Sequence, residues 1–167
     1  MQTLDNAISL IGNLSTLFVL CGAAFTVYLF LKGILRVWWR LGLGLSRRKI
    51  AVFADQEFGE LRSLLVESGL FQDKNVIQIT KSALKRAQAY DMFLVHWKAF
   101  ANEIDEILKM KDNSTALIVY APQSEGFIDK PLMEKISAER NAIVVNLRGR
   151  LLNDVLVSMI TTGYKAK

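Results

Sequence analysis

Hydrophobic residues follow two different patterns along the chain, and the first is a continuous apolar run. From Ile8 to Leu31 there are 24 residues without a charge or a proline. As a helix, this run would be about 36 Å long, more than the ~30 Å hydrocarbon core of a bilayer. A soluble core helix would carry charges on one face, and a signal peptide would begin with basic residues, whereas this run is preceded by Asp5. The run therefore predicts a retained transmembrane helix.

Polar and small residues within this run recur at helical spacing. They repeat every three or four residues as a polar seam: Ser9, Asn13, Thr16, Leu20 and Ala23. Lipid gives no reason to keep such residues on an outward face, whereas contacts between membrane helices are enriched in them. The amide of Asn13 in particular needs a partner in hydrocarbon. The seam predicts a homo-oligomer; the alternative is a lone anchor whose hydroxyl groups bond within their own helix.

Basic residues gather directly after the apolar run. There are six of them before the first expected strand: Lys32, Arg36, Arg40, Arg47, Arg48 and Lys49. The positive-inside rule then places the N-terminus outside and the following residues in the cytoplasm, with Tyr28, Trp38 and Trp39 as an aromatic belt. We expect residues 1–45 to form the anchor with a basic extension, and residues 46–167 to form a cytosolic domain. The lone Cys21 excludes an intrachain disulfide.

The second pattern is a regular alternation of short apolar runs and amphipathic segments. Five runs rich in valine and isoleucine predict buried parallel strands at Ile50–Ala54, Val76–Thr80, Met92–His96, Ala116–Tyr120 and Ala142–Asn146. Helical periodicity follows each of them, at Glu57–Ser68, Lys81–Tyr90, Ala99–Lys109, Lys130–Arg140 and Leu151–Thr162. This order predicts an α/β domain in three layers, with a five-stranded parallel sheet of flavodoxin-like strand order 2-1-3-4-5.

The net charge of +5 does not indicate a nucleic-acid-binding domain. Six of the 21 basic residues and one of the 16 acidic residues precede Ile50, so the remaining part carries 15 of each and is neutral. A basic stripe along a duplex backbone is therefore not expected. The excess cations near the apolar run are expected to contact anionic lipid headgroups instead.

Candidate binding residues lie where the expected strands end, because ligands of such sheets bind at the carboxyl ends of the strands. Four basic residues follow strand ends: Lys81, Lys98, Arg148 and Arg150. In a neutral domain, this local set predicts an anionic ligand such as a nucleotide messenger, near helix N-termini. The alternative is that they are ordinary solvated loop residues.

Several established motifs are missing from the sequence. The segment after the first strand reads ADQEFGE rather than G-x-G-x-x-G, and there is no P-loop. His96 and Trp97 stand where a receiver domain needs an acidic residue. One histidine and one cysteine exclude the usual His/Cys metal clusters, so no metal and no cofactor are expected. No catalytic set is assigned, and His96 is either a hydrogen-bonded structural residue or a catalytic one.

The alternation over residues 49–163 also resembles the TIR fold. TIR enzymes that cleave NAD carry a glutamate on the helix after the third strand, often beside a tryptophan, and here Trp97 precedes Glu103 and Glu106. The resemblance implies an NAD-cleaving hydrolase as an alternative function. The second strand runs directly into Thr80 and Lys81, so the long loop that TIR domains use for assembly is missing.

The combination of one membrane helix and a small cytosolic α/β domain resembles the membrane effectors of bacterial antiphage systems related to CRISPR, CBASS or Hailong. The resemblance implies a single-pass protein of the bacterial inner membrane that senses a nucleotide. In response, the protein would either open an ion channel or disrupt the membrane. Its partners would be lipid and further copies of itself. The third alternative is a passive tether that docks another protein.

Overall fold

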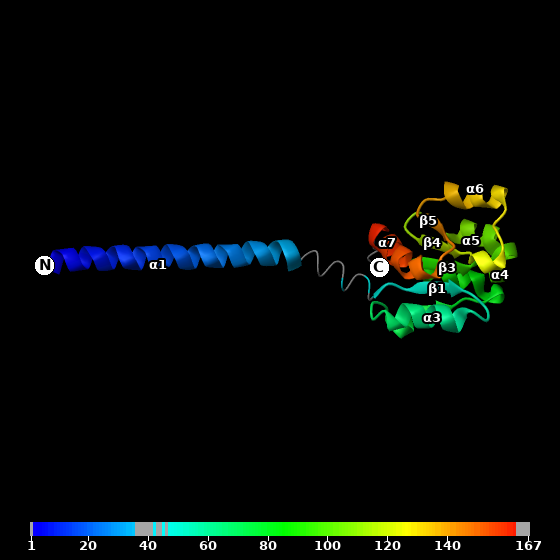
Figure 1. Cartoon of the computed structure of the whole chain (residues 1–167), viewed down its shortest axis with the longest axis horizontal. Helices are drawn as coiled ribbons and strands as arrows, with labels where there is room; N and C mark the ends of the chain where they lie inside the picture. Colours follow the sequence, from blue (N-terminus) through cyan, green and yellow to red (C-terminus); the bar gives the residue numbers. More distant parts are fainter. Residues whose placement is uncertain (1, 36–41, 43–44, 46, 163–167) are drawn as a thin grey trace. The chain divides into compact units, whose positions relative to one another are not determined.

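The chain divides into two structural units, which are described separately. A computed structural model describes residues 2–35, 42, 45 and 47–162. Contacts within it cluster into one unit at Met1–Gly42 and a second at Leu43–Lys167 (Figure 1).

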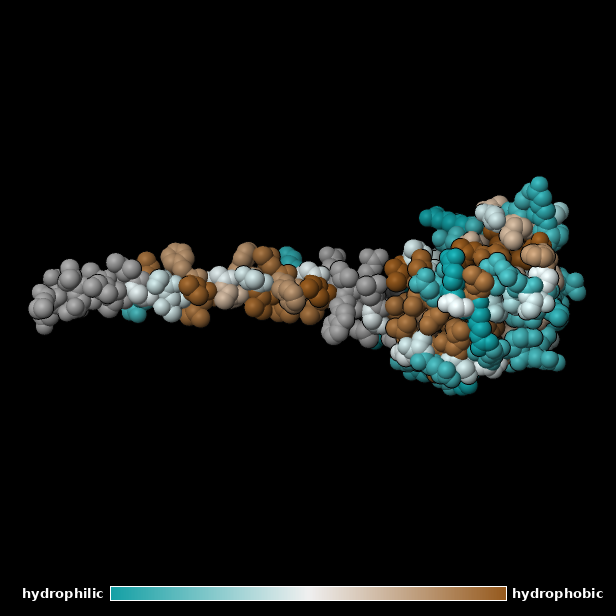
Figure 2. Space-filling view, in the orientation of Figure 1, coloured by the Kyte–Doolittle hydropathy of each residue, from teal (hydrophilic) through white to brown (hydrophobic). Residues whose placement is uncertain are grey.

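The first unit is a long apolar helix. Helix α1 spans Gln2–Phe30 and continues as a wider turn, η1, over Leu31–Leu35. Within the segment Gly12–Leu35, an 18-residue window has a mean hydropathy of 2.1, and none of that window is buried. Hydrophobic side chains cover much of the face seen in Figure 2. As the sequence predicts, this helix is long and apolar enough to cross a membrane.

One hydroxyl group of the polar seam bonds within its own helix. Thr16 Oγ1 donates a hydrogen bond to the Gly12 carbonyl at 2.8 Å. This is the behaviour expected of a hydroxyl in a lone anchor, so Thr16 does not require a second helix. The side chain of Ser9 lies outside the described residues. Exposed side chains are found at the remaining seam positions: Asn13, Leu20 and Ala23.

The expected membrane interface is described in part. The ammonium group of Lys32 lies 5.7 Å from the ring centroid of Tyr28, within cation–π range. The other aromatic and basic residues expected at this interface lie outside the described residues: Arg36, Trp38, Trp39 and Arg40.

The second unit is built on a five-stranded parallel sheet. Its strands are β1 (Ile50–Phe53), β2 (Val76–Gln78), β3 (Met92–His96), β4 (Ala116–Tyr120) and β5 (Ala142–Val145). They are arranged in the order β2-β1-β3-β4-β5, and every pair is parallel. The predicted α/β class, strand positions and strand order are confirmed. All side chains of β1, β3 and β4 are buried, because helices cover both faces of the sheet.

Helices cover the two faces of the sheet unequally (Figure 1). Helices α3 (Phe58–Glu67) and α7 (Arg148–Thr161) pack on one face, around Leu94, Ile118 and other inward residues. The opposite face is covered by η3 (Lys81–Ala89), α4 (Trp97–Phe100), α5 (Ile104–Met110) and α6 (Lys130–Ala138). The alternation of side chains along each strand assigns each core residue to one of these two layers.

Two of the expected helices have a different form from the predicted one. The segment Lys81–Ala89 is a 3-10 helix with a kink at Ala83. Its buried residues, Leu84 and Ala87, are three positions apart, and the tighter 3-10 winding places such residues on one face. The predicted helix at Ala99–Lys109 is likewise interrupted, because Phe100 leaves helical backbone angles where η4 (Ala101–Glu103) begins.

Arg48 belongs to the α/β domain, so the prediction that it contacts lipid headgroups is wrong. The residue is 6% exposed. Its Nη1 donates to Thr162 Oγ1 at 2.8 Å, and its Nη2 donates to the Thr162 carbonyl at 2.6 Å. Arg48 therefore ties the segment before β1 to the end of α7, and the burial that this requires removes it from the lipid surface.

Candidate functional site

Among the described residues, two pockets lie beside the sheet, one on each face. The strand order changes direction between β1 and β3, and in such sheets the crevice at this switch point is the usual place for a ligand. The smaller pocket lies at this switch point, because it is lined by residues from the ends of β1 and β3, whereas the larger pocket lies along the edge strand β5. The loop after β4 separates the two pockets, since Gln123 and Phe127 line one of them and Ser124 and Glu125 line the other.

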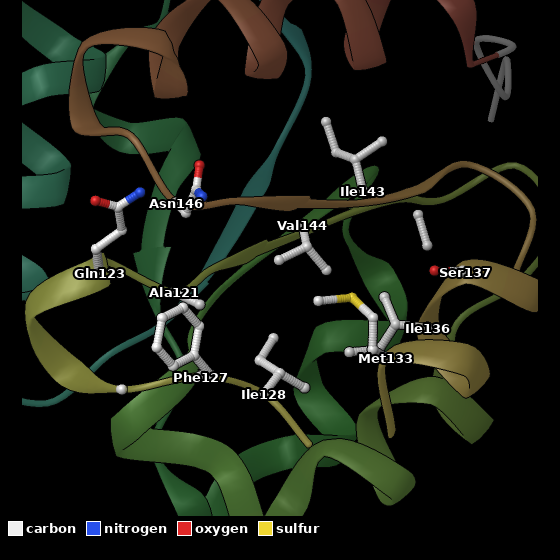
Figure 3. Close-up of a pocket in the computed structure, with 12 residues that line it drawn as sticks. Ala121, Gln123, Phe127, Ile128, Met133, Ile136, Ser137, Ile143, Val144 and Asn146 are labelled. Carbon is white, nitrogen blue, oxygen red and sulfur yellow. The ribbon is translucent and has the colours of Figure 1, made fainter. Parts of the chain in front are cut away.

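The larger cavity, which we call the β5 pocket, has a volume of about 400 Å³. Its walls combine apolar side chains with polar groups in nearly equal measure and come from β5, α6 and the loop after β4: Ala121, Gln123, Gly126, Phe127, Ile128, Met133, Ile136, Ser137, Ala142, Ile143, Val144 and Asn146. Figure 3 shows Ile128, Met133 and Val144 gathered in its centre, and the amides of Gln123 and Asn146 at one end. A cavity of this size that combines apolar walls with polar groups is typical of a small-molecule site.

An unusually exposed aromatic ring forms part of this pocket. Phe127 is 91% exposed, although it is a large apolar side chain. Gly126 precedes it with a φ angle of +100°, a backbone conformation that glycine adopts without strain. The turn at Gly126 thus presents the ring at the pocket in Figure 3. A planar ligand can stack on this ring while the nearby amides hydrogen-bond to its edge.

The smaller cavity, the His96 pocket, has a volume of about 200 Å³ and lies on the α3 and α7 face. His96 ends β3 and stands opposite Tyr120, the last residue of β4. Glu57 immediately precedes α3, and Glu125 ends the short turn η5 (Gln123–Glu125) after β4. Three separate connections therefore bring one imidazole and two carboxylates together.

His96 lies between the two carboxylates but makes no hydrogen bond through Nδ1. Its side chain is 2% exposed, with Nδ1 3.8 Å from Glu57 Oε2 and Nε2 3.4 Å from Glu125 Oε2. Both His96 Nδ1 and Glu125 Oε2 are buried without a hydrogen-bond partner among the described residues. Buried polar atoms are nearly always bonded, so such atoms in a pocket indicate a missing partner.

Tyr120 borders the same cluster. Its ring meets the His96 ring edge to face, with the ring centroids 5.8 Å apart. Burial, and secondarily the negative charge of Glu125, raises the pKa of the Tyr120 hydroxyl above its usual value of 10.0. At neutral pH the ring is therefore uncharged and serves as a wall of the pocket.

The predicted basic residues do not form one free cationic rim. Arg148 lines the His96 pocket and pairs with Glu60, and Arg150 pairs with Asp154 at 3.6 Å. Lys81 pairs with Glu103 at 3.8 Å and lies over the ring of Phe100, which is part of the opposite core layer. Lys98 is exposed at the start of α4. Binding of an anion by these four residues stays a prediction, and three of them already have a carboxylate neighbour.

The glutamates implied by the TIR resemblance lie away from both pockets. Glu103 is largely buried beside Lys81, with its Oε2 lacking a hydrogen bond among the described residues. Glu106 is exposed on α5. Neither residue lines the β5 pocket or the His96 pocket.

Sequence reasoning missed the cluster of Glu57, His96 and Glu125. Each residue follows a strand end, so the information was present in the sequence. The strands concerned are β1, β3 and β4, which are neighbours in the predicted order. Reading the strand ends in spatial order rather than in chain order would have placed these three residues together.

Comparison with known protein families, with characterised proteins and with solved structures identified no match to this chain. Its function is therefore inferred from its own residues and their geometry.

Proposed function

We propose that this chain is an oligomeric membrane effector whose cytosolic α/β domain senses a nucleotide-type ligand. In this proposal α1 and η1 anchor the chain in the bacterial inner membrane with the N-terminus outside. The polar seam joins the helices of several copies, and ligand binding changes their arrangement so that the membrane is gated or disrupted. The observation that carries the proposal is the β5 pocket with its exposed Phe127.

The lining of the β5 pocket suits a nucleobase. A base stacks on an aromatic side chain with a gain of about 1–3 kcal/mol, largely independent of its identity. Phe127 supplies such a ring, and the amides of Gln123 and Asn146 match the donors and acceptors on the edge of a base. Residues such as Val144 form an apolar floor, which would exclude water from the face of the base opposite Phe127.

We place the phosphates of such a ligand at the start of α7. Asn146 lines the pocket, and α7 begins two residues later at Arg148. The first turn of a 14-residue helix can offer backbone N–H groups to an anion, although the Arg150 N–H already donates to the Leu147 carbonyl at 3.1 Å. A phosphate would compete with Glu60 for Arg148 and with Asp154 for Arg150.

A nucleotide that binds the domain is expected to raise its melting temperature. The full-length protein in detergent would be melted with cyclic mononucleotides, cyclic dinucleotides and short oligonucleotides. At a concentration 100 times its Kd, a ligand stabilises the folded state by about 2.7 kcal/mol. Replacing Phe127 with alanine is expected to weaken binding by about five- to 160-fold through lost stacking.

The matched control is Val157→Ala, which shortens an apolar side chain that is 51% exposed on α7 and outside the pocket. Its nucleotide affinity should equal that of the wild type, and Phe127→Tyr should retain binding. If no nucleotide shifts the melting temperature, or if Phe127→Ala binds normally, the nucleotide proposal fails. Loss of NAD in a parallel incubation, abolished by Glu103→Gln, would favour the hydrolase instead.

Association through the helix is tested by changing the polar seam. Asn13→Leu removes the amide that needs a partner, and Ala23→Phe places a large ring where close helix packing requires a small residue. Both variants are expected to lower the oligomer mass in detergent, as measured by light scattering. Phe18→Leu, an apolar substitution on the opposite side of the helix from the seam, serves as the control. An unchanged mass for both seam variants would show that the copies do not associate through this face.

A further inference from the structure

The cluster of Glu57, His96 and Glu125 has the composition of a metal site. One ligand atom from each residue can be chosen so that all three lie within 4.8 Å of one another. Imidazole nitrogen with carboxylate oxygen is a donor set that zinc accepts in proteins. We propose that these three residues bind a divalent first-row transition-metal ion, with zinc as the best match.

The burial of His96 is the observation that distinguishes this cluster from an ordinary group of acidic residues. Its side chain is 2% exposed, and its Nδ1 has no hydrogen bond among the described residues. Glu125 also has a buried oxygen without a hydrogen bond. Because the folded domain buries these two atoms in the same pocket without bonding them, a cation bound by His96 and Glu125, with Glu57 beside them, would contribute a missing partner.

The distances in the cluster are close to those in a zinc site. Two donor atoms about 2.1 Å from a tetrahedral zinc ion are about 3.4 Å apart. The separation of His96 Nε2 and Glu125 Oε2 is 3.4 Å, whereas the 3.8 Å separation of Glu57 Oε2 is from Nδ1, the other ring nitrogen. An ion binds only one of these nitrogens, so one carboxylate already lies at zinc-site distance from its nitrogen and the other must move toward the ion from within the 4.8 Å that encloses the three ligand atoms. The side chains of Glu57 and Glu125 are 33% and 20% exposed, which leaves room for that movement.

The donor set also selects among cations. Magnesium and calcium prefer all-oxygen ligand sets, so the buried imidazole disfavours them. Copper(I) prefers thiolate or thioether ligands, and the His96 pocket contains neither cysteine nor methionine. Two carboxylates neutralise the charge of a divalent ion. Three protein ligands leave the fourth zinc position for water or a ligand atom, and the cavity of about 200 Å³ provides the room.

The three proposed metal ligands are not among the residues proposed for the nucleotide, although Arg148, proposed for its phosphates, lines the same pocket as they do. The three ligands line the His96 pocket on the α3 and α7 face, whereas the β5 pocket is lined by a different set. Zinc binding can therefore succeed or fail whether or not the chain responds to a nucleotide.

Zinc binding to the full-length protein in detergent, measured by equilibrium dialysis and titration calorimetry, tests the proposal. The expected result is one zinc ion per chain and a higher melting temperature with zinc than with EDTA, because the ion binds the folded state. Cobalt(II) in place of zinc should give the visible absorption of a low-coordinate site. Glu57→Gln and Glu125→Gln should each weaken zinc binding by more than about tenfold, and His96→Gln should abolish it.

Glu60→Gln is the matched control, because Glu60 lines the same pocket but pairs with Arg148. It should bind zinc as the wild type does, as should Cys21→Ser, which removes the lone thiol. Glu57→Gln and Glu125→Gln should melt in EDTA at about the wild-type temperature. These two variants therefore separate loss of metal binding from loss of fold if His96→Gln is unstable. Absence of zinc binding, or equal affinity in Glu57→Gln and Glu125→Gln, would overturn the proposal.

Discussion

Replacing Phe93 with alanine is expected to lower the free energy of unfolding by about 3–5 kcal/mol, a large part of the stability of a small domain. Phe93 is fully buried in β3, a central strand of the sheet. Its ring meets that of Phe53 edge to face at 5.4 Å, and Phe53 meets Phe100 at 5.7 Å. The substitution removes one wall of this aromatic cluster and leaves a cavity that the tightly paired strands cannot close.

Chemical denaturation of the full-length protein in detergent, followed by tryptophan fluorescence and circular dichroism, measures the loss. Phe127→Ala is the matched control because it removes the same ring from a position that is 91% exposed. It should change the free energy of unfolding by less than about 0.5 kcal/mol. Similar losses for Phe93→Ala and Phe127→Ala would contradict the assignment of the core.

Two arginines in the middle of α1 are expected to release the chain from the membrane. Ala24→Arg and Phe25→Arg lie within Gly12–Leu35, the segment with the apolar composition of a membrane span. Each arginine at the centre of such a helix costs about 2.5–3.5 kcal/mol of insertion free energy. Together they would remove most of the gain from inserting the helix, and we expect the chain to leave the membrane fraction on carbonate extraction.

The control for this variant is Ala24→Leu with Phe25→Leu, which keeps the segment apolar and should remain in the membrane. Protease resistance of the α/β domain would show whether the released chain is still folded. If the double-arginine variant stays in the membrane fraction, or if carbonate extracts the wild type, then α1 is not a membrane span.

Local patterns in the sequence determined the class of both units. Twenty-four uncharged residues can satisfy their backbone groups in a membrane only as a helix, so composition alone predicts the long apolar helix that the structure contains. Five valine- and isoleucine-rich runs separated by helical segments allow few topologies, because parallel strands need right-handed crossovers. The observed order β2-β1-β3-β4-β5 is the one that this reasoning predicted.

Contacts between residues far apart in the chain decided which residues form the candidate sites and which of their charges are paired. The sequence located Lys81, Arg148 and Arg150 near strand ends, but only the folded chain shows that each has a carboxylate neighbour. Arg48 looked like a membrane-facing cation until its bonds to Thr162, which is 114 residues away in the chain, placed it inside the domain. Such pairings depend on where distant segments meet, and a local pattern does not contain that information.

Both pockets belong to the tertiary structure for the same reason. Periodicity shows which face of a helix or strand is buried, but it does not show where packing leaves a cavity or how a loop turns. The β5 pocket exists because the turn at Gly126 places Phe127 beside Val144 and Asn146. His96 meets Glu57 and Glu125 because β1, β3 and β4 are adjacent in the sheet, which brings together three chain segments separated by up to 68 residues.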